Sequence, residues 1–325
     1  MSERILLTGA AGFIGSHLTE RLLARGDSVV GVDNFDPFYD PAEKRAYLTG
    51  AQAHPSFTLV EADCADADAL EAALGDHEFD AIVHLAAKAG VRPSIADPLG
   101  YLRANVVATQ ALLELARRRG VRRFVFGSSS SVYGNGERVP FSETEKVNRP
   151  ISPYAATKAA GELLCHNYHH LYGMNILALR FFTVYGPRQR PDLAIRKFAT
   201  QMIRGEPIEM YGDGSSERDY TWIDDILQGV IAAIDRTGTV SREYEIINLG
   251  ESRTTSLRRL IELISAATGR EPHIVQKPMQ PGDVRRTWAD VSRAGSLLGY
   301  RPTTPVEEGI PRFVDWLVPW LEGKR

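Results

Sequence analysis

Short, continuously apolar runs alternate with longer segments of mixed polarity through the first half of the chain. Such runs are typical of strands that are buried on both faces of a parallel sheet. We predict strands at residues 5–7, 28–32, 57–60, 81–84, 124–126, 176–179 and 244–248. Helical periodicity predicts helices at residues 13–25, 100–119 and 153–172. The alternation predicts an α/β fold, a doubly wound parallel sheet of the Rossmann type.

The texture of the sequence changes after residue 180, where proline and glycine become frequent and turns separate shorter elements. The strand predicted at 244–248 nevertheless has the apolar character of the first sheet. We therefore expect a first domain at residues 1–180, rejoined by about 221–250. A smaller, discontinuous carboxyl-terminal α/β domain is expected at residues 181–220 and 251–325.

Of the 325 residues, 43% are hydrophobic and 24% are charged, as is usual for a soluble globular protein. The formal net charge of −3 gives no reason to expect nucleic acid or a membrane as partner. Cys64 and Cys165 are the only cysteines, which predicts neither a disulfide framework nor a zinc cluster. The apolar run near Met1 is too short for a signal peptide or membrane span. We expect a cytoplasmic protein without a bound metal.

Three glycines, Gly9, Gly12 and Gly15, follow the first predicted strand and open the first predicted helix. In this position glycines let the backbone approach a pyrophosphate, whose charge the helix amino terminus stabilises. Their spacing departs from the common Gly-x-Gly-x-x-Gly pattern. Phe13 and Ile14, between the last two glycines, belong to the same candidate cofactor site.

Acidic and small residues after the next strands extend this site. Asp33 ends the second strand, where a carboxylate can bind a ribose diol, and Asn34 rather than an arginine follows it, which favours NAD over NADP. Asp63 is a candidate for binding the adenine amine, with a helix cap as the alternative. Small residues after the fourth strand let the backbone pass close to a cofactor. That segment comprises Leu85, Ala86, Ala87 and Lys88.

Tyr154 and Lys158 are four residues apart on a predicted helix, so their side chains share one face. A lysine cation beside a phenol favours the phenolate and lowers a tyrosine pKa from about 10 toward neutrality. Such a tyrosine can remove the proton of a sugar hydroxyl while hydride leaves the carbon. An ordinary surface helix can carry the same pair, but its combination with the glycine motif favours NAD-dependent chemistry.

Five motifs occur in order along nearly the whole chain: residues 8–15, 84–87, 129–134, the pair Tyr154 and Lys158, and residues 180–187. Together they resemble the extended short-chain dehydrogenase/reductase superfamily. The resemblance implies bound NAD, a sheet of seven strands and a carboxyl-terminal lobe that binds a nucleotide diphosphate. It also implies a homodimer formed through the helices at 100–119 and 153–172.

Three further stretches resemble UDP-glucuronate 4-epimerases: residues 33–41, 88–94 and 181–192. The resemblance implies NAD-dependent interconversion of UDP-glucuronate and UDP-galacturonate through a 4-keto intermediate. Related dehydratases carry an acid pair where this chain has Ser130 and Ser131, and related decarboxylases carry glutamate at Ser131, so both reactions are disfavoured. A UDP-glucose/UDP-galactose 4-epimerase, a UDP-glucuronate decarboxylase and a catalytically silent NAD-binding regulator stay open as alternatives.

The resemblance also implies catalytic roles. Tyr154 takes the C4 hydroxyl proton, Lys158 lowers the tyrosine pKa and holds the nicotinamide ribose, and Ser129 donates a hydrogen bond to the C4 oxygen. A 4-keto uronic acid is prone to lose carbon dioxide, and donors that hold its carboxylate should slow that loss. The candidate donors are Ser129, Ser130, Ser131, Thr183 and Arg190.

Two residues of the carboxyl-terminal part are candidates for binding the nucleotide. Arg218 matches a family arginine that binds phosphate, and a planar guanidinium suits that task. Tyr211 could stack near uracil, although core packing explains this residue equally well. For Arg190, a surface position between prolines is the alternative.

Overall fold

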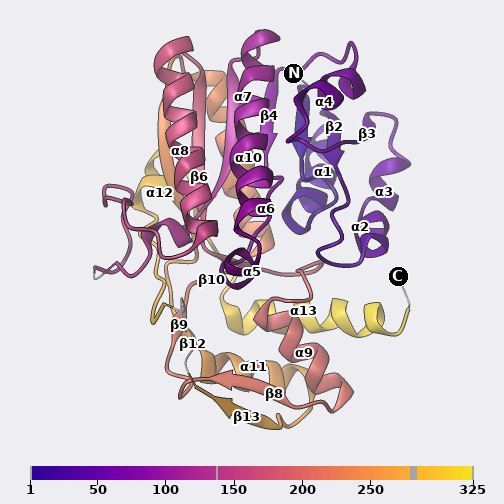
Figure 1. Cartoon of the computed structure of the whole chain (residues 1–325). Coiled ribbons are helices and arrows are strands. Elements are labelled where there is room, and N and C mark those ends of the chain that lie inside the picture. Colours follow the sequence, from indigo (N-terminus) through magenta and orange to yellow (C-terminus); the bar gives the residue numbers. More distant parts are fainter. Residues whose placement is uncertain (1, 137, 279–283, 324–325) are drawn as a thin grey trace. The chain divides into compact units, whose positions relative to one another are not determined.

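The predicted apolar runs form a parallel sheet of seven strands in the order β11-β6-β5-β4-β1-β2-β3 (Figure 1). Its strands are β1 (Arg4–Thr8), β2 (Ser28–Asp33), β3 (Phe57–Glu61), β4 (Ala81–His84), β5 (Arg123–Ser129), β6 (Asn175–Phe181) and β11 (Tyr244–Leu249). β1 pairs in parallel with both β2 and β4, so the strand order reverses between them. The crevice at the carboxyl ends of such strands is the usual ligand site of this fold. The predicted doubly wound sheet is confirmed.

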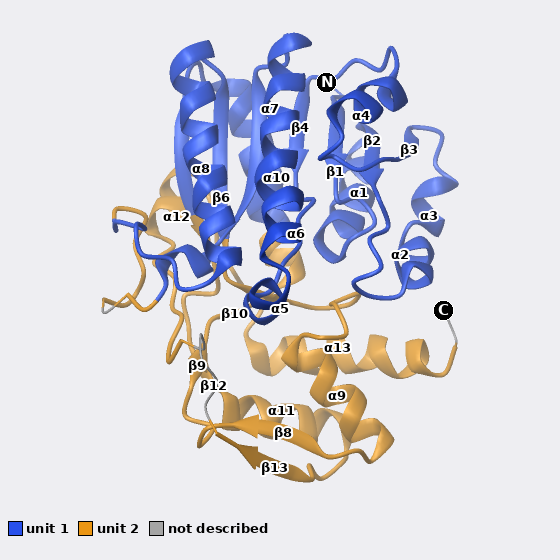
Figure 2. Cartoon of the chain, in the orientation of Figure 1, with its two compact units in different colours: residues 1–134, 145–180, 227–247 blue, residues 135–144, 181–226, 248–325 orange. Residues whose placement is uncertain are grey.

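The computed structural model describes residues 2–136, 138–278 and 284–323. The chain divides into two compact units (Figure 2). Unit 1 contains residues 1–134, 145–180 and 227–247, and unit 2 contains residues 135–144, 181–226 and 248–325. Among the described residues, no helix has the length and apolar character needed to traverse a bilayer.

Helices cover both faces of the unit 1 sheet (Figure 1). The helices of this unit are α1 (Phe13–Arg25), α2 (Pro41–Tyr47), α3 (Thr49–Gln52), α4 (Ala67–Leu74), α5 (Val91–Ala96), α6 (Pro98–Leu102), α7 (Ala108–Arg118), α8 (Pro153–Tyr172) and most of α10 (Ile223–Thr239). The hydroxyl of Ser152 accepts the Ala155 amide at 3.1 Å and so caps α8, which ends at Gly173 in the left-handed conformation. α7 and α8 pack side by side on one face of the sheet.

The helical segment predicted at residues 100–119 is observed, but it is not a uniform α-helix. The segment consists of α6, a π-helical turn η1 (Arg103–Val107) and α7. At the end of the turn the Ala108 amide bonds the carbonyl of Arg103, five residues earlier rather than four. Asn105 lies within this turn, and its side chain bonds Lys88 and Thr157, which lie outside the helix. The polarity pattern of the segment does not indicate such a turn.

The core of unit 1 lies between the sheet and its helices, with fully buried side chains on the central strands such as Leu6, Ile82 and Phe124. On one face α8 approaches β5 closely. A Cβ atom at Gly161 of α8 would overlap the ring of Phe126 in β5. The absence of a side chain at Gly161 therefore sets the distance between this helix and the sheet.

Unit 2 contains short paired strands and four helices among its described residues. The pairs are β7 (Thr183–Tyr185) with β10 (Tyr220–Trp222), β8 (Ile208–Tyr211) with β13 (Ile274–Lys277), and β9 (Glu217–Arg218) with β12 (Thr255–Ser256). The helices are α9 (Ala194–Arg204), α11 (Leu257–Thr268), α12 (Ser292–Leu298) and α13 (Val306–Leu321). The buried Asp219 carboxylate accepts the amides of Glu251, Ser252 and Ala289, so one side chain holds two separate loops, at 251–252 and at 289.

We predict that Gly161→Ala lowers the free energy of unfolding by about 1–3 kcal/mol, because the added methyl group overpacks the contact between α8 and β5. Urea denaturation of the two proteins measures the difference. Gly50→Ala in α3 is the matched control, since its new Cβ meets no atom within 4 Å and helix propensity favours alanine. Equal unfolding midpoints for wild type and Gly161→Ala would contradict the proposed tight contact.

Candidate functional site

The predicted glycine motif forms the turn between β1 and α1. Gly9 has a φ of +73°, and a Cβ atom there would lie 2.7 Å from the amide nitrogen of Ala86, which follows β4. Gly15 faces the carbonyl of Gly9 so closely that any side chain would overlap it. Gly12 precedes the first turn of α1 and provides no side-chain cap, so the first amides of the helix have no side-chain acceptor there. Such a turn can accommodate a phosphate group.

Asp33, at the end of β2, holds this turn from the side. Its Oδ2 accepts the Ala11 amide at 3.0 Å and its Oδ1 accepts the Phe35 amide at 2.8 Å. Burial raises the pKa of the Asp33 carboxyl, and the two amides oppose that rise. Asn34 beside it is exposed, and its side chain accepts the amide of Asp36 at 3.0 Å.

Asp63 and Lys88 both have protein partners. Asp63 accepts the Ala65 amide at 2.9 Å and pairs with the guanidinium of Arg103 at 3.0 Å. The cap of α4 is Asp66 rather than Asp63. The Lys88 ammonium lies 3.1 Å from an Asp97 oxygen. Leu85 and Ala86 are half-buried and Ala87 is exposed, in the loop that passes Gly9.

The predicted catalytic residues lie on α8 and at the end of β5. Tyr154 is half-buried in the first turn of α8, and its ring packs edge-on against Tyr101 with centroids 6.2 Å apart. Lys158 is buried one turn later and donates to the carbonyl of Gly127 at 2.7 Å. Ser129 ends β5, and its hydroxyl oxygen accepts the Ser131 amide at 3.2 Å. Ser130 and Ser131 begin the short 3₁₀ helix η2 (Ser130–Tyr133).

Burial controls the charge of Lys158. It lowers the pKa of the ammonium to about 8, whereas the neighbouring Cys165 and Glu162 raise it. The ring of Phe126 lies 5.1 Å from the ammonium and supplies a cation–π contact. The site thus contains a lysine whose pKa lies near 8. In its charged form such a lysine can stabilise the phenolate of a neighbouring tyrosine.

A buried polar network, missed by the sequence analysis, supports α8 from the π-helical turn. The Asn105 amide nitrogen donates to the Lys88 carbonyl and to the Thr157 hydroxyl, both at 2.9 Å. Thr157 in turn donates to the Tyr154 carbonyl at 2.8 Å. One sign of this network is visible in the sequence: Asn105 lies in the middle of a predicted helix, where asparagine is disfavoured.

His84, at the end of β4, is a second buried group that the sequence analysis did not assign to the site. One ring nitrogen lies 2.8 Å from the Thr8 hydroxyl and the other lies 3.0 Å from the Thr109 hydroxyl. Burial, with a smaller contribution from Lys158, lowers the pKa of His84 to about 3, so the ring is neutral. It therefore connects β1, β4 and α7 without adding charge.

Four candidate substrate residues lie in unit 2. Arg190 binds both carboxylate oxygens of Asp192, at 2.9 and 2.7 Å, so it is a held arginine rather than a free surface one. Arg218 donates to the carbonyl of Glu217 at 2.9 Å, and the Tyr211 hydroxyl donates to Glu209 at 3.1 Å. The fourth, Thr183, is half-buried in β7. Arg190 lies in the loop between β7 and α9, whereas Thr183, Tyr211 and Arg218 lie on β7, β8 and β9.

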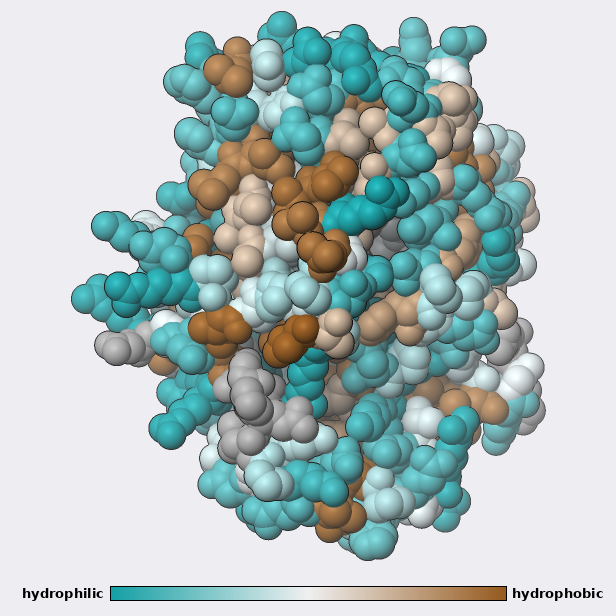
Figure 3. Space-filling model, viewed as in Figure 1, coloured by the Kyte–Doolittle hydropathy of each residue, from teal (hydrophilic) through white to brown (hydrophobic). Residues whose placement is uncertain are grey.

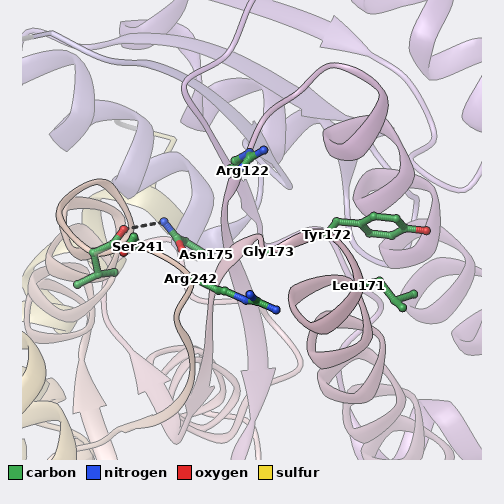
Figure 4. A pocket seen from close by; sticks show the side chains of 8 residues that line it. Arg122, Leu171, Tyr172, Gly173, Asn175, Ser241 and Arg242 are labelled. Atoms are coloured by element: carbon green, nitrogen blue, oxygen red, sulfur yellow. Dashed lines mark hydrogen bonds between the residues drawn. The ribbon is translucent and has the colours of Figure 1, made fainter.

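An open pocket of about 450 Å³ lies within unit 1, at the other end of α8. It is lined by Arg122, Leu171, Tyr172, Gly173, Asn175, Val240, Ser241 and Arg242 (Figure 4). The Asn175 amide donates to the Val240 carbonyl at 2.8 Å across it. In Figure 4 the Tyr172 ring points away from Asn175 and the loop beside it. The predicted catalytic residues do not line this pocket, and no group of three or more metal-ligating side chains occurs among the described residues.

The sheet order and the glycine turn after β1 define a Rossmann-type α/β protein. The model of the NAD dependent epimerase/dehydratase family matches residues 5–250. The chain belongs to this family, and the resemblance found in its motifs is confirmed.

Proteins named as UDP-sugar 4-epimerases match nearly the whole chain. It is 42% identical to a UDP-glucuronate 4-epimerase of Thermodesulfobacterium geofontis, over 96% of this chain and 95% of the relative. It is 37% identical to the UDP-glucuronic acid 4-epimerase of Bacillus cereus, solved with UDP-glucuronic acid and NAD, with a TM-score of 0.91 over 98% and 99% of the two chains. A UDP-glucose 4-epimerase of Thermotoga maritima, solved with UDP-glucose, is 32% identical with a TM-score of 0.88 over 98% and 99%.

We predict that Lys158 loses its proton near pH 8, well below the range of an exposed lysine, because burial destabilises its charged form. The ammonium is therefore present below that pH and absent above it. NMR of protein with ¹³C-labelled lysine measures the titration, and Lys158→Arg assigns the signal. A midpoint in the ordinary lysine range would contradict the prediction.

Proposed function

We propose that the protein is an NAD-dependent UDP-glucuronate 4-epimerase that interconverts UDP-glucuronate and UDP-galacturonate. The observation that carries the proposal is the full-length likeness to the Bacillus cereus enzyme solved with UDP-glucuronic acid and NAD. The sequence motifs at residues 33–41, 88–94 and 181–192 support it independently. We assign NAD binding to unit 1 and nucleotide-sugar binding to unit 2, with Thr183, Arg190, Tyr211 and Arg218 as its contacts.

The residues of unit 1 fit NAD. The uncapped first turn of α1 and the glycine turn before it suit a pyrophosphate, and Asp33 at the end of β2 suits a ribose diol. The candidate contacts are Gly9, Gly12, Phe13, Ile14, Gly15, Asp33, Asn34, Asp63, Leu85, Ala86, Ala87, Lys88, Tyr154 and Lys158. When bound, NAD supplies a reversible hydride acceptor for C4 of the sugar.

The chain's own residues move and hold the proton. The Tyr154 phenolate accepts the proton of the C4 hydroxyl, and the Lys158 ammonium one turn away stabilises that phenolate. The Ser129 oxygen already accepts an amide, so its hydroxyl hydrogen remains available to the C4 oxygen. The same groups return the proton after the keto sugar has presented its other face.

Retention of the sugar carboxylate requires donors that keep its charge localised. Ser129, Ser130 and Ser131 place hydroxyls at the end of β5 and in the first turn of η2. We assign the carboxylate to these hydroxyls, and their neutral donors oppose the spreading of charge that loss of carbon dioxide requires.

We further propose a homodimer that pairs the apolar face of α6, η1 and α8. Leu99, Leu102, Val107 and Leu163 on these elements are 78%, 50%, 42% and 73% exposed. Figure 3 shows hydrophobic surface gathered where Figure 1 places α6, α7 and α8. Exposed apolar patches of this kind mark protein interfaces. We also place the protein in the cytoplasm, where its buried free thiols Cys64 and Cys165 stay reduced.

The function is tested by incubating the purified protein with UDP-glucuronate, without added NAD, and following the products by NMR. We expect UDP-galacturonate, because NAD that returns its hydride in every cycle need not be supplied. UDP-xylose would instead identify a decarboxylase. Formation of UDP-galactose from UDP-glucose, with UDP-glucuronate unchanged, would identify the other epimerase. Absence of turnover with both sugars would refute the enzyme assignment.

In the same assay Tyr154→Phe should lower kcat by about 10²–10⁴-fold, the usual contribution of a general acid–base group. Its melting temperature should stay that of the wild type. Tyr172→Phe, in the last turn of α8, is the matched control and should keep normal turnover. Near-normal turnover of Tyr154→Phe would remove this tyrosine from the proton transfer.

Leu163→Glu should convert the dimer to a monomer, because it places a charge in the centre of an apolar interface. Light scattering coupled to size-exclusion chromatography measures the mass. Ile274→Glu in β13 is the control, since this residue is 42% exposed but lies in unit 2. A monomeric wild type, or an unchanged dimer for Leu163→Glu, would refute this interface.

A further inference from the structure

Two oppositely charged side chains are buried beneath the predicted catalytic residues. Glu162 of α8 is 3% exposed and Arg180 of β6 is 1% exposed. The guanidinium binds both carboxylate oxygens, each at 2.8 Å. Removing two ions from water is costly, and a buried pair adds little net stability compared with apolar packing. The other contacts of the pair connect it to the segment that contains Ser129.

Glu162 holds the end of β5. The Ser128 hydroxyl donates to its Oε1 at 2.6 Å, and Ser128 directly precedes Ser129. One turn earlier on α8, Lys158 donates to the carbonyl of Gly127 at 2.7 Å. α8 thus binds two successive residues of β5 just before the predicted catalytic serine, so the position of Ser129 follows from these two contacts.

Arg180 extends the same contact to the next segment. Its guanidinium carbon lies 4.7 Å from the ring centroid of Tyr133, within the range of a cation–π contact. Tyr133 ends η2, the helix that begins with Ser130 and Ser131. The buried pair, carried by α8 and β6, therefore contacts β5 and η2, the two elements that contain Ser129, Ser130 and Ser131.

Glu162 also lies one turn from Lys158, whose buried ammonium it stabilises. Three other titratable groups near the two residues are kept neutral by burial. Burial raises the pKa of the Cys165 thiol and the Tyr244 hydroxyl above their usual values, and it lowers the pKa of His84 to about 3. Glu162, paired with Arg180, thus lies one helical turn from Lys158 and, together with the neighbouring Cys165, raises the pKa of the lysine ammonium.

We propose that Glu162, held by Arg180, is a positioning residue for the proton-transfer group: it fixes the end of β5 that carries Ser129 and stabilises the charged form of Lys158. The proposal rests on the epimerase function proposed above for its effect on turnover. Its structural and electrostatic consequences can be measured without substrate. Tyr154, Lys158 and Ser129 remain the groups that contact the reacting atoms.

Glu162→Gln tests the charge, because glutamine keeps the size of the side chain and one acceptor oxygen. We expect the Lys158 titration, followed by ¹³C NMR, to move to lower pH. With UDP-glucuronate, kcat should fall between about tenfold and a hundredfold, and the alkaline limb of its pH profile should move to lower pH. Glu71→Gln, which removes an exposed carboxylate paired with Arg118 on α4 and α7, is the control and should change neither.

Ser128→Ala tests whether the Ser128–Glu162 hydrogen bond fixes the end of β5. It also provides a test if Glu162→Gln does not fold. It leaves the ion pair intact, so the Lys158 titration should stay that of the wild type. Amide hydrogen exchange at residues 127–131 should become faster in both variants, while exchange in β1 stays unchanged. The control Glu71→Gln should exchange like the wild type throughout.

A Lys158 titration that Glu162→Gln leaves unmoved would overturn the electrostatic part of the proposal. Wild-type exchange at residues 127–131 in Ser128→Ala would overturn the positional part. A fall in kcat without either change would mark general structural damage and would equally contradict the proposal. Failure of the wild type to convert UDP-glucuronate would refute the epimerase function alone, because the NMR and exchange results do not depend on substrate.

Discussion

The close packing of α8 on β5 is the constraint on which the candidate catalytic centre depends. Gly161 lets the helix lie against the ring of Phe126, and at that separation Lys158 reaches the carbonyl of Gly127. Tyr154 and Lys158 are carried by the helix and Ser129 by the strand. A helix pushed outward by the width of one methyl group would break the Lys158–Gly127 hydrogen bond, since hydrogen bonds tolerate only a few tenths of an ångström.

A second close contact made possible by a glycine lies at the end of β1. Gly9 allows the loop after β4 to pass against the turn after β1, and Asp33 fixes the turn through the Ala11 amide. Main chain therefore lies against main chain where the strand order reverses. A surface of this kind can approach a flat or highly charged cofactor closely, because few side chains stand between them.

The sequence predicted the sheet well because its strands are buried on both faces, so their apolar runs are continuous and easily separated from helices. It predicted α8 to the residue, from the pattern between Ser152 and Gly173. It did not predict the π-turn at residues 103–107, because the contacts of Asn105 with Lys88 and Thr157 that accompany the turn are distant in sequence.

The predicted site residues differ in how far local pattern could define them. The glycine turn and the Tyr154/Lys158 pair are set by spacing within one element, which a sequence displays directly. The sequence also shows Glu162 and Arg180 as charged residues within apolar segments. Their pairing depends on the fold, because it requires β6 to lie next to β5 and α8 to pack on these strands. Tertiary pairing of this kind has no local signature.

The path of the chain through its two units has an evolutionary consequence. Residues 135–144, 181–226 and 248–325 alternate with the segments of unit 1, and both α10 and β11 continue from one unit into the other. No single recombination point in the gene could therefore exchange one unit for that of a relative. Diversification of such a protein has to proceed by point substitution and by changes in loop length, in contrast to proteins whose modules are joined end to end and can be shuffled.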